Sequence, residues 1–325
     1  RLVGSEMCIR DSPDKPFYMY WASGALHGPH HVNKEWADRY KGKFDDGWDA
    51  YRERAFKNAK AKGWIPENAQ LTPRHPRMAA WDSIPDHQKP FQSRLMEVLA
   101  GFGEHTDHQV GRILSEVERL GYEENTLVVY IWGDNGSSGE GQDGTISELL
   151  AQNSIGTEID EHIKVLDELG GLDALGSPLV DNMYHAGWAW AGSTPYQGLK
   201  LMGSYLGGTR NPMAIKWPKG IKPDPKPRSQ FHHCNDLVPT IYELAGITPP
   251  KMVNGVTQDP IHGTSFAYAF NAPDAPGQLT TQFFDIFGSR SIYHDGWMAG
   301  AVGPRLPWVK GVCACVCLCV CVCAC

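Results

Sequence analysis

Three features are scarce in this sequence of 325 residues: net positive charge, long apolar runs, and cysteine in its central part. The formal net charge of −7 excludes a general nucleic-acid binder, because contacts to phosphates need a basic face. No apolar run reaches the roughly 18 residues that a bilayer-spanning helix needs, so no membrane span is predicted. Between residues 13 and 303 the one cysteine is Cys234, which excludes a disulfide within that segment. Hydrophobic residues make up 42% of the chain, which favours a folded globular protein with a packed core.

Both ends of the chain differ from the rest. Seven of the nine cysteines lie in the last thirteen residues, where they alternate with Ala, Val and Leu. A metal-binding tract, a row of disulfides and a translated TG-repeat DNA are three interpretations of this pattern. We interpret residues 304–325 as a translated repeat and expect them to be disordered. Residues 1–12 resemble a translated sequencing adapter and have no apolar core of a signal peptide.

The segment between these ends alternates strand-like and helix-like stretches. The aromatic run at residues 15–21 predicts a buried strand, and residues 126–131 and 213–217 predict two more. Helices are predicted within residues 34–62, 94–121, 158–169 and 235–245, the last with an Asn235 cap and a stop at Gly246. Residues 283–287 and 290–293 predict a hairpin around Gly288. This alternation indicates an α/β layered fold with a mostly parallel sheet.

Polar groups follow two of these strands, where α/β folds commonly bind ligands. After the first strand come His27, His30 and His31, which form either a solvated loop or an imidazole site for an anion or metal. After the strand at 126–131 come Asp134 and Asn135. Asp-Asn-Gly is a common turn, but its oxygens are also the ligands that Ca²⁺ and Mg²⁺ prefer.

A further basic residue, Lys200, precedes the sequence Gly207-Gly208-Thr209-Arg210. A single lysine before a glycine-rich turn is most often an ordinary surface residue. The order of the features is more informative: a strand with a histidine loop, a long helix, a strand with Asp-Asn-Gly, a long excursion, the lysine, and another strand.

This order resembles the type I sulfatases, in particular the bacterial arylsulfatase branch of the alkaline-phosphatase superfamily. The resemblance covers most of residues 13–303. It rests on ordered blocks: His27-Gly28-Pro29-His30, Lys34-Glu35-Trp36, Tyr40-Lys41-Gly42-Lys43-Phe44-Asp45, Glu104-His105-Thr106-Asp107, Trp132-Gly133-Asp134-Asn135-Gly136, Gly187-Trp188-Ala189, Thr194-Pro195-Tyr196-Gln197, Lys200, Gly207-Gly208-Thr209-Arg210-Asn211, Asp236-Leu237-Val238-Pro239-Thr240-Ile241, Ala245-Gly246-Ile247 and Ile292-Tyr293-His294-Asp295-Gly296-Trp297.

The resemblance implies a calcium-dependent hydrolase of small-molecule sulfate monoesters. Asp134 and Asn135 would be two ligands of the calcium ion, and His27 and Lys200 would bind the ester and act in catalysis. His30 and His31 are alternatives to His27. The implied fold is alkaline-phosphatase-like but incomplete, with a partial α/β domain at residues 13–279 and the start of an antiparallel C-terminal subdomain at 280–303. A periplasmic or secreted location is suggested by the family alone.

Two parts of the family pattern are missing from the sequence. Sulfatases carry a formylglycine nucleophile, made from Cys or Ser in the motif C/S-x-P/A-x-R, and no such motif occurs here. The paired aspartates that complete the metal site are also missing. We therefore expect an internal piece of a sulfatase, inactive as given, with no nucleophile of its own.

Two other functions remain open. A phosphonate or phosphate-ester hydrolase of the same superfamily would share the fold and the plan of the site. A non-catalytic sulfatase-like binding protein would keep the fold without the chemistry. Trp188, Trp190, Tyr196 and Tyr205 either line a substrate pocket or pack in the core, which is the more common place for aromatic residues between loops.

Overall fold

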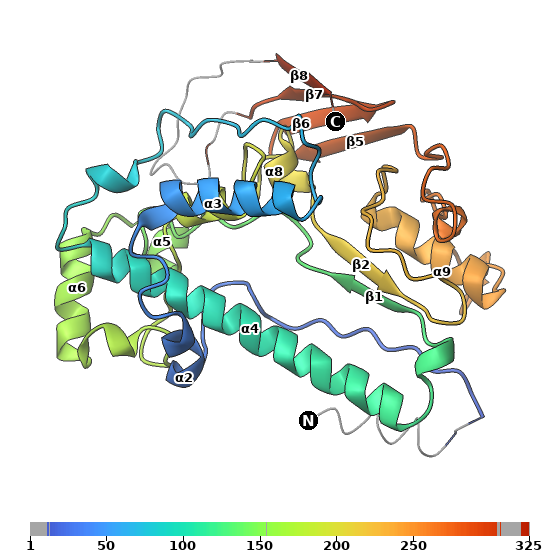
Figure 1. Cartoon of the computed structure of the whole chain (residues 1–325), viewed down its shortest axis with the longest axis horizontal. Helices are drawn as coiled ribbons and strands as arrows, with labels where there is room; N and C mark the ends of the chain where they lie inside the picture. The colour runs from blue at the N-terminus through green and yellow to red at the C-terminus, as the bar shows by residue number, and fades with distance from the viewer. Residues whose placement is uncertain (1–11, 13, 154, 304–305, 307–319, 325) are drawn as a thin grey trace.

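A computed structural model describes residues 12, 14–153, 155–303, 306 and 320–324 of the chain (Figure 1). Residues 1–11 of the predicted adapter sequence, and most of the predicted repeat at 304–325, lie outside these residues. Of the repeat, residues 320–324 are described, as a strand. Among the described helices, none combines the length and the apolar character needed to cross a membrane.

The helices and strands are distributed along the whole described chain. The α-helices are α2 (Lys34–Ala37), α3 (Gly47–Ala61), α4 (Lys89–Arg119), α5 (Glu148–Gln152), α6 (Ile159–Glu168), α7 (Ala186–Gly192), α8 (Leu206–Thr209) and α9 (Leu237–Ala245). The 3₁₀-helices are η1 (Asp38–Tyr40), η2 (Trp81–Ser83), η3 (Glu123–Asn125), η4 (Gly171–Ala174), η5 (Cys234–Asp236) and η6 (Ala267–Ala269). The strands are β1 (Val128–Ile131), β2 (Met213–Lys216), β3 (Met252–Val253), β4 (Val256–Thr257), β5 (Thr281–Ile286), β6 (Ser289–His294), β7 (Trp297–Ala301) and β8 (Val320–Ala324).

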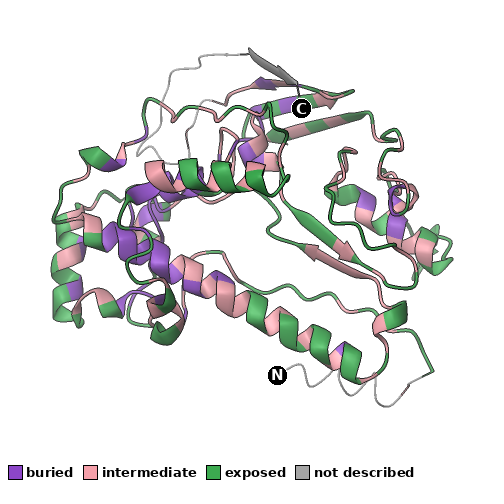
Figure 2. Cartoon of the chain, in the orientation of Figure 1, coloured by how far each residue is buried: buried purple, intermediate pink, exposed green. Residues whose placement is uncertain are grey.

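Helix α4 is the longest element, and its N-terminal half is the more deeply buried (Figure 2). Pro90 lies in its first turn, where a missing backbone N–H has no consequence, so the helix begins earlier than predicted. Gly101 lets α2 approach closely, because a Cβ at this position would lie 2.6 Å from the backbone nitrogen of Ala37. The helix ends at the predicted place, with Gly121 in the left-handed region at φ +78°.

The mixed α/β class and the small antiparallel sheet near the C-terminal end are confirmed, but the prediction of a mostly parallel sheet is wrong for the described strands. Those strands form sheets β1-β2, β3-β4 and β5-β6-β7-β8, and each named pair is antiparallel. The predicted strand at residues 15–21 has no assigned secondary structure. Tyr18 and Tyr20 in it are 74% and 80% exposed. An apolar sequence supplies side chains for a core, but a strand also requires a neighbour for its backbone hydrogen bonds.

The predicted hairpin is present in the C-terminal sheet. Strands β5 and β6 pair from Thr281 with His294 to Ile286 with Ser289. Phe287 and Gly288 form the two-residue turn with φ values of 49° and 80°. Positive φ at both positions matches the twist of antiparallel strands. Strand β8 extends this sheet by pairing with β7.

The main core is aromatic and joins α3, α7 and the N-terminal half of α4. Trp48 and Trp188 are fully buried, and their rings meet edge to face with centroids 5.6 Å apart. Trp81 packs edge to face on Trp48 as well, at 4.9 Å. The Trp188 indole N–H donates to the backbone oxygen of Gln92 in α4, so its polar atom is satisfied within the core.

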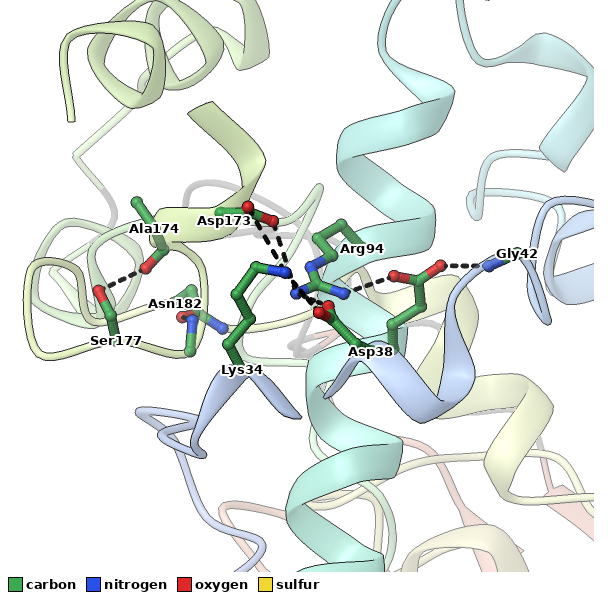
Figure 3. A network of polar contacts seen from close by, with 10 residues as sticks. Lys34, Asp38, Gly42, Arg94, Asp173, Ala174, Ser177 and Asn182 are labelled. Atoms are coloured by element: carbon green, nitrogen blue, oxygen red, sulfur yellow. Dashed lines mark hydrogen bonds and ion pairs between the residues drawn. The ribbon is translucent and has the colours of Figure 1, made fainter. Parts of the chain in front are cut away.

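A network of charged side chains fixes the short helices α2 and η1 to α4 (Figure 3). The buried Arg94 guanidinium donates to Glu97 at 2.9 Å and to Asp38 at 2.8 Å. Lys34 contacts Asp38 and lies 3.6 Å from Asp173 on η4. Glu97 also accepts the backbone N–H of Gly42 at 2.7 Å. These bonds attach residues 34–42, which follow the histidine loop, to the central helix.

Candidate active site

The histidine loop brings His27 against Lys200, although the two residues are 173 positions apart. The His27 side chain is exposed, and its Nε2 lies 3.2 Å from the Lys200 Nζ. Its Nδ1 lies 2.8 Å from the carbonyl oxygen of Gly28. A carbonyl oxygen can only accept, so Nδ1 carries the hydrogen and Nε2 presents its lone pair to the lysine ammonium.

The other two histidines of the loop have different surroundings. His30 is buried and stacks on Tyr184 with ring centroids 5.0 Å apart. Burial, with smaller effects from His27 and His31, lowers the pKa of His30 to about 3. His31 Nε2 donates to the carbonyl oxygen of Val180 at 2.9 Å. Of the three imidazoles, the described structure joins His27 to the lysine and uses His30 and His31 in packing and backbone contacts.

Asp134 and Asn135 lie just after β1, on an exposed loop. The Asn135 side-chain amide donates to Asp134 Oδ1 at 2.8 Å. With its amide oriented to satisfy both atoms, Asn211 accepts from the Asn135 N–H at 3.0 Å and donates to the Asn135 carbonyl at 2.9 Å. The loop backbone is therefore held by the segment that follows α8. Asn211 follows the Gly-Gly-Thr-Arg sequence, and its contact with Asn135 gives it a role that its place in the sequence did not indicate.

The donor set of this loop does not by itself fit a calcium ion. Asp134 and Asn135 supply carboxylate and amide oxygens, which are the correct ligand types, whereas calcium usually takes six to eight oxygens. Part of the Asp134 acceptor capacity is occupied by Asn135. Across the described part of the chain, no group of three or more His, Cys, Asp or Glu side chains is arranged to hold a metal.

Glu140 is a site residue that the sequence analysis missed. Its Oε2 accepts from Lys200 Nζ at 2.7 Å and from Ser138 Oγ at 2.9 Å. The Glu140 and Lys200 side chains are 23% and 16% exposed, so the ion pair is partly shielded from water. Burial opposes ionisation of the Glu140 carboxyl, but the bonds from Lys200 and Ser138 outweigh it and lower its pKa. Its one signal in the sequence is its position five residues after Asn135, in the same loop.

Backbone contacts hold the loop at residues 133–140 against the lysine segment. The Lys200 N–H donates to the Ser137 carbonyl at 3.0 Å, and the Gly136 N–H donates to the Gly208 carbonyl at 3.1 Å. The His27 loop is attached to the core, because the His30 N–H donates to the carbonyl of the fully buried Asn182. The structure therefore brings His27, Lys200 and Glu140 together. The loop with Asp134 and Asn135 is attached to the lysine segment through its backbone, without a side-chain contact from either residue to His27 or Lys200 among the described interactions.

The aromatic residues considered for a substrate pocket mostly belong to the core. Trp188 and Trp190 are 1% and 6% exposed. The Arg52 guanidinium lies over the Trp190 ring at 4.3 Å and donates to the carbonyls of Trp190, Pro195 and Tyr196. Tyr196 and Tyr205 are partly buried. Arg52 thus orders the chain that leads toward Lys200.

Comparisons with known proteins all match this chain to sulfatases. A family model described as Sulfatase matches residues 5–247. The chain is 30% identical over 237 residues to an uncharacterized sulfatase of Schizosaccharomyces pombe, covering 72% of this chain and 40% of that protein. It is 27% identical over 261 residues to an arylsulfatase of Klebsiella aerogenes, covering 80% of this chain and 53% of that protein. The chain therefore spans about half the length of these relatives or less.

The chain was also compared with solved structures. A putative sulfatase of Bacteroides fragilis aligns with a TM-score of 0.48 and 14% identity, covering 93% of this chain and 48% of that one.

Proposed function

The chain belongs to the sulfatase family, and on this premise we propose that it binds sulfate monoesters at the site formed by His27 and Lys200. The observation that carries the proposal is the contact between Lys200 Nζ and His27 Nε2 at 3.2 Å. A sulfate monoester is a compact anion with a bridging oxygen that leaves as an alcohol or phenol. The Lys200 ammonium can bind the anion, and the His27 imidazole beside it can hydrogen-bond the bridging oxygen.

Each side chain has its own part in the proposed chemistry. Lys200 neutralises the non-bridging oxygens of the ester as a point charge. His27 hydrogen-bonds the bridging oxygen, and it supplies a proton when the S–O bond breaks. For this, Nε2 must carry a proton while Nδ1 keeps its hydrogen bond to the Gly28 carbonyl.

Hydrolysis needs further groups. We propose that Asp134 and Asn135 supply two oxygens of a calcium site and that a formylglycine is the nucleophile of the complete reaction, as the family pattern implies. The printed sequence has no C/S-x-P/A-x-R motif, and the described residues supply too few metal oxygens. We therefore propose that this chain alone binds the ester without releasing sulfate, which matches the non-catalytic alternative for the chain itself.

Calorimetric titration with 4-nitrophenyl sulfate tests this proposal. The full chain should bind the ester, and Lys200→Ala and His27→Ala should each weaken binding about tenfold or more. The control is Lys57→Ala, which removes one positive charge from an exposed position on α3. Binding that is equally affected by all three substitutions, or by none, would contradict the assignment of the site.

A further inference from the structure

The Lys200 ammonium already has an anionic partner within this protein. Glu140 Oε2 lies 2.7 Å from Lys200 Nζ, and Ser138 Oγ holds the same oxygen at 2.9 Å. The Ser138 hydroxyl and the Glu140 backbone N–H, at 3.2 Å, form a local turn that aims the carboxylate at the lysine. Because Ser138 holds the Glu140 carboxylate from within the same loop, we expect the carboxylate to remain beside Lys200 when an ester binds.

The pair sets the charge that an incoming ester meets. Within this pair, one positive and one negative group cancel. Both members of the pair are mostly buried, so water screens their interactions less than it would at an exposed position. An anion that binds at Lys200 therefore gains its attraction to the ammonium and is repelled by Glu140.

We propose that Glu140 is a specificity-determining residue that favours singly charged sulfate monoesters over doubly charged phosphate monoesters. The inference rests on the proposed function, because it requires the ester to bind at Lys200. Sulfate and phosphate monoesters have similar tetrahedral shapes, so hydrogen-bonding geometry alone discriminates poorly between them. Their charge differs by one unit at neutral to alkaline pH, and a fixed carboxylate repels the more negative ester more strongly.

The size of the effect follows from Coulomb's law. Attraction to Lys200 and repulsion from Glu140 both grow with the charge of the ester, so Glu140 cancels much of the additional attraction that a second negative charge would gain. With the effective dielectric of about 20 that applies near protein surfaces, one additional charge a few ångströms away corresponds to about tenfold or more in affinity. Partial exposure of Glu140 reduces this value, and we expect about tenfold.

The test is a ratio of dissociation constants for 4-nitrophenyl phosphate and 4-nitrophenyl sulfate, measured on the full chain at mildly alkaline pH. In the wild-type chain Glu140 should weaken binding of the phosphate ester more than binding of the sulfate ester. Glu140→Gln keeps the side-chain shape and removes the charge, so the ratio should fall about tenfold. The control Glu53→Gln makes the same change in net charge at an exposed position on α3 and should leave the ratio unchanged. An unchanged ratio in a folded Glu140→Gln chain would overturn the proposal.

A second ligand keeps the inference testable if Glu140→Gln does not fold. Methyl 4-nitrophenyl phosphate has a phosphorus centre but only one negative charge. If charge decides, the wild-type chain binds it about as tightly as the sulfate ester. If it binds as weakly as the doubly charged phosphate, the element at the centre decides and Glu140 has no such role.

The two proposals fail in different ways. If the wild-type chain binds none of these esters, or if Lys200→Ala leaves binding unchanged, the proposed function fails and the inference fails with it. If binding requires Lys200 but the ratio does not depend on Glu140, the function stands and the inference alone is wrong.

Discussion

Gly136 and Gly207 approach so closely that a Cβ atom at position 136 would lie 1.9 Å from the Gly207 carbonyl oxygen. The obstructing atom belongs to a backbone, which cannot rotate away like a flexible side chain. This approach lets the loop bearing Asp134, Asn135 and Glu140 lie against α8, where the Gly136 N–H donates to the Gly208 carbonyl. The geometry of the candidate site therefore depends on the absence of a side chain at position 136.

A single methyl group at this position tests the close approach. We expect Gly136→Ala to lower the free energy of unfolding by about 1–3 kcal/mol and to weaken ester binding, because the loop must move away from α8. Gly111→Ala is the matched control, since a Cβ there meets nothing within 4 Å and lies within α4. It should be neutral or stabilise by up to about 1 kcal/mol. Equal urea midpoints for the two variants would contradict this account.

The charged network on α4 predicts a large effect of removing one member. Arg94→Ala leaves the buried Glu97 without its guanidinium partner, so we expect a loss of about 3–5 kcal/mol in denaturant unfolding. Arg54→Ala removes an exposed pair with Asp46 and should cost about 1 kcal/mol or less. A small loss for Arg94→Ala would show that water replaces the guanidinium at this position.

Two buried histidines predict that the fold loses stability in mild acid. Burial lowers the pKa of His30 to about 3 and that of His185 to about 4, whereas an unfolded histidine titrates near 6.5. Between these values the unfolded chain binds more protons than the folded chain, so stability falls as the pH decreases from about 6.5 to about 4. Each group should contribute on the order of 2 kcal/mol to this loss.

Urea unfolding at several pH values measures the effect. The unfolding free energy should be clearly lower at about pH 4.5 than at about pH 7.5. His30→Gln removes one titrating group, so its curve should be flatter in this window even if the variant is less stable throughout. A wild-type curve that is flat in this window would contradict the assignment of both imidazoles as neutral.

The incomplete oxygen set predicts weak calcium binding by the chain alone. With two ligands from Asp134 and Asn135, we expect a dissociation constant no tighter than the millimolar range, near that of the weakest protein calcium sites. Thermal unfolding in about 1 mM calcium should then shift little, and Asp134→Ala should not change it. A micromolar dissociation constant that Asp134→Ala abolishes would show that other residues of this chain complete the site.

Local signals in the sequence were sufficient for several elements. The apolar spacing along residues 94–121 and Gly121 defined most of α4, and Gly246 with φ +65° ends α9 as predicted. The start of α9 differs, because η5 precedes it and Asp236, rather than Asn235, occupies the cap position. The cap position is set by the backbone angles of a single residue, and either of two neighbouring polar residues can occupy it.

Long-range relationships were harder to predict. No periodicity in the sequence relates Lys200 to His27, and their pairing was anticipated only through the resemblance to a family. Glu140 was missed because a glutamate in a polar loop looks like any solvated residue until the fold places a lysine beside it. Trp190 shows the same limitation, since the guanidinium that lies over its ring belongs to Arg52, which is 138 residues away.

The most direct test of the central claim is a crystal structure of the chain with 4-nitrophenyl sulfate bound. We predict sulfate oxygens within hydrogen-bonding distance of Lys200 Nζ, with the bridging oxygen facing His27 Nε2. Density for the ester at another place, with the contact between Lys200 and His27 unchanged, would contradict the account.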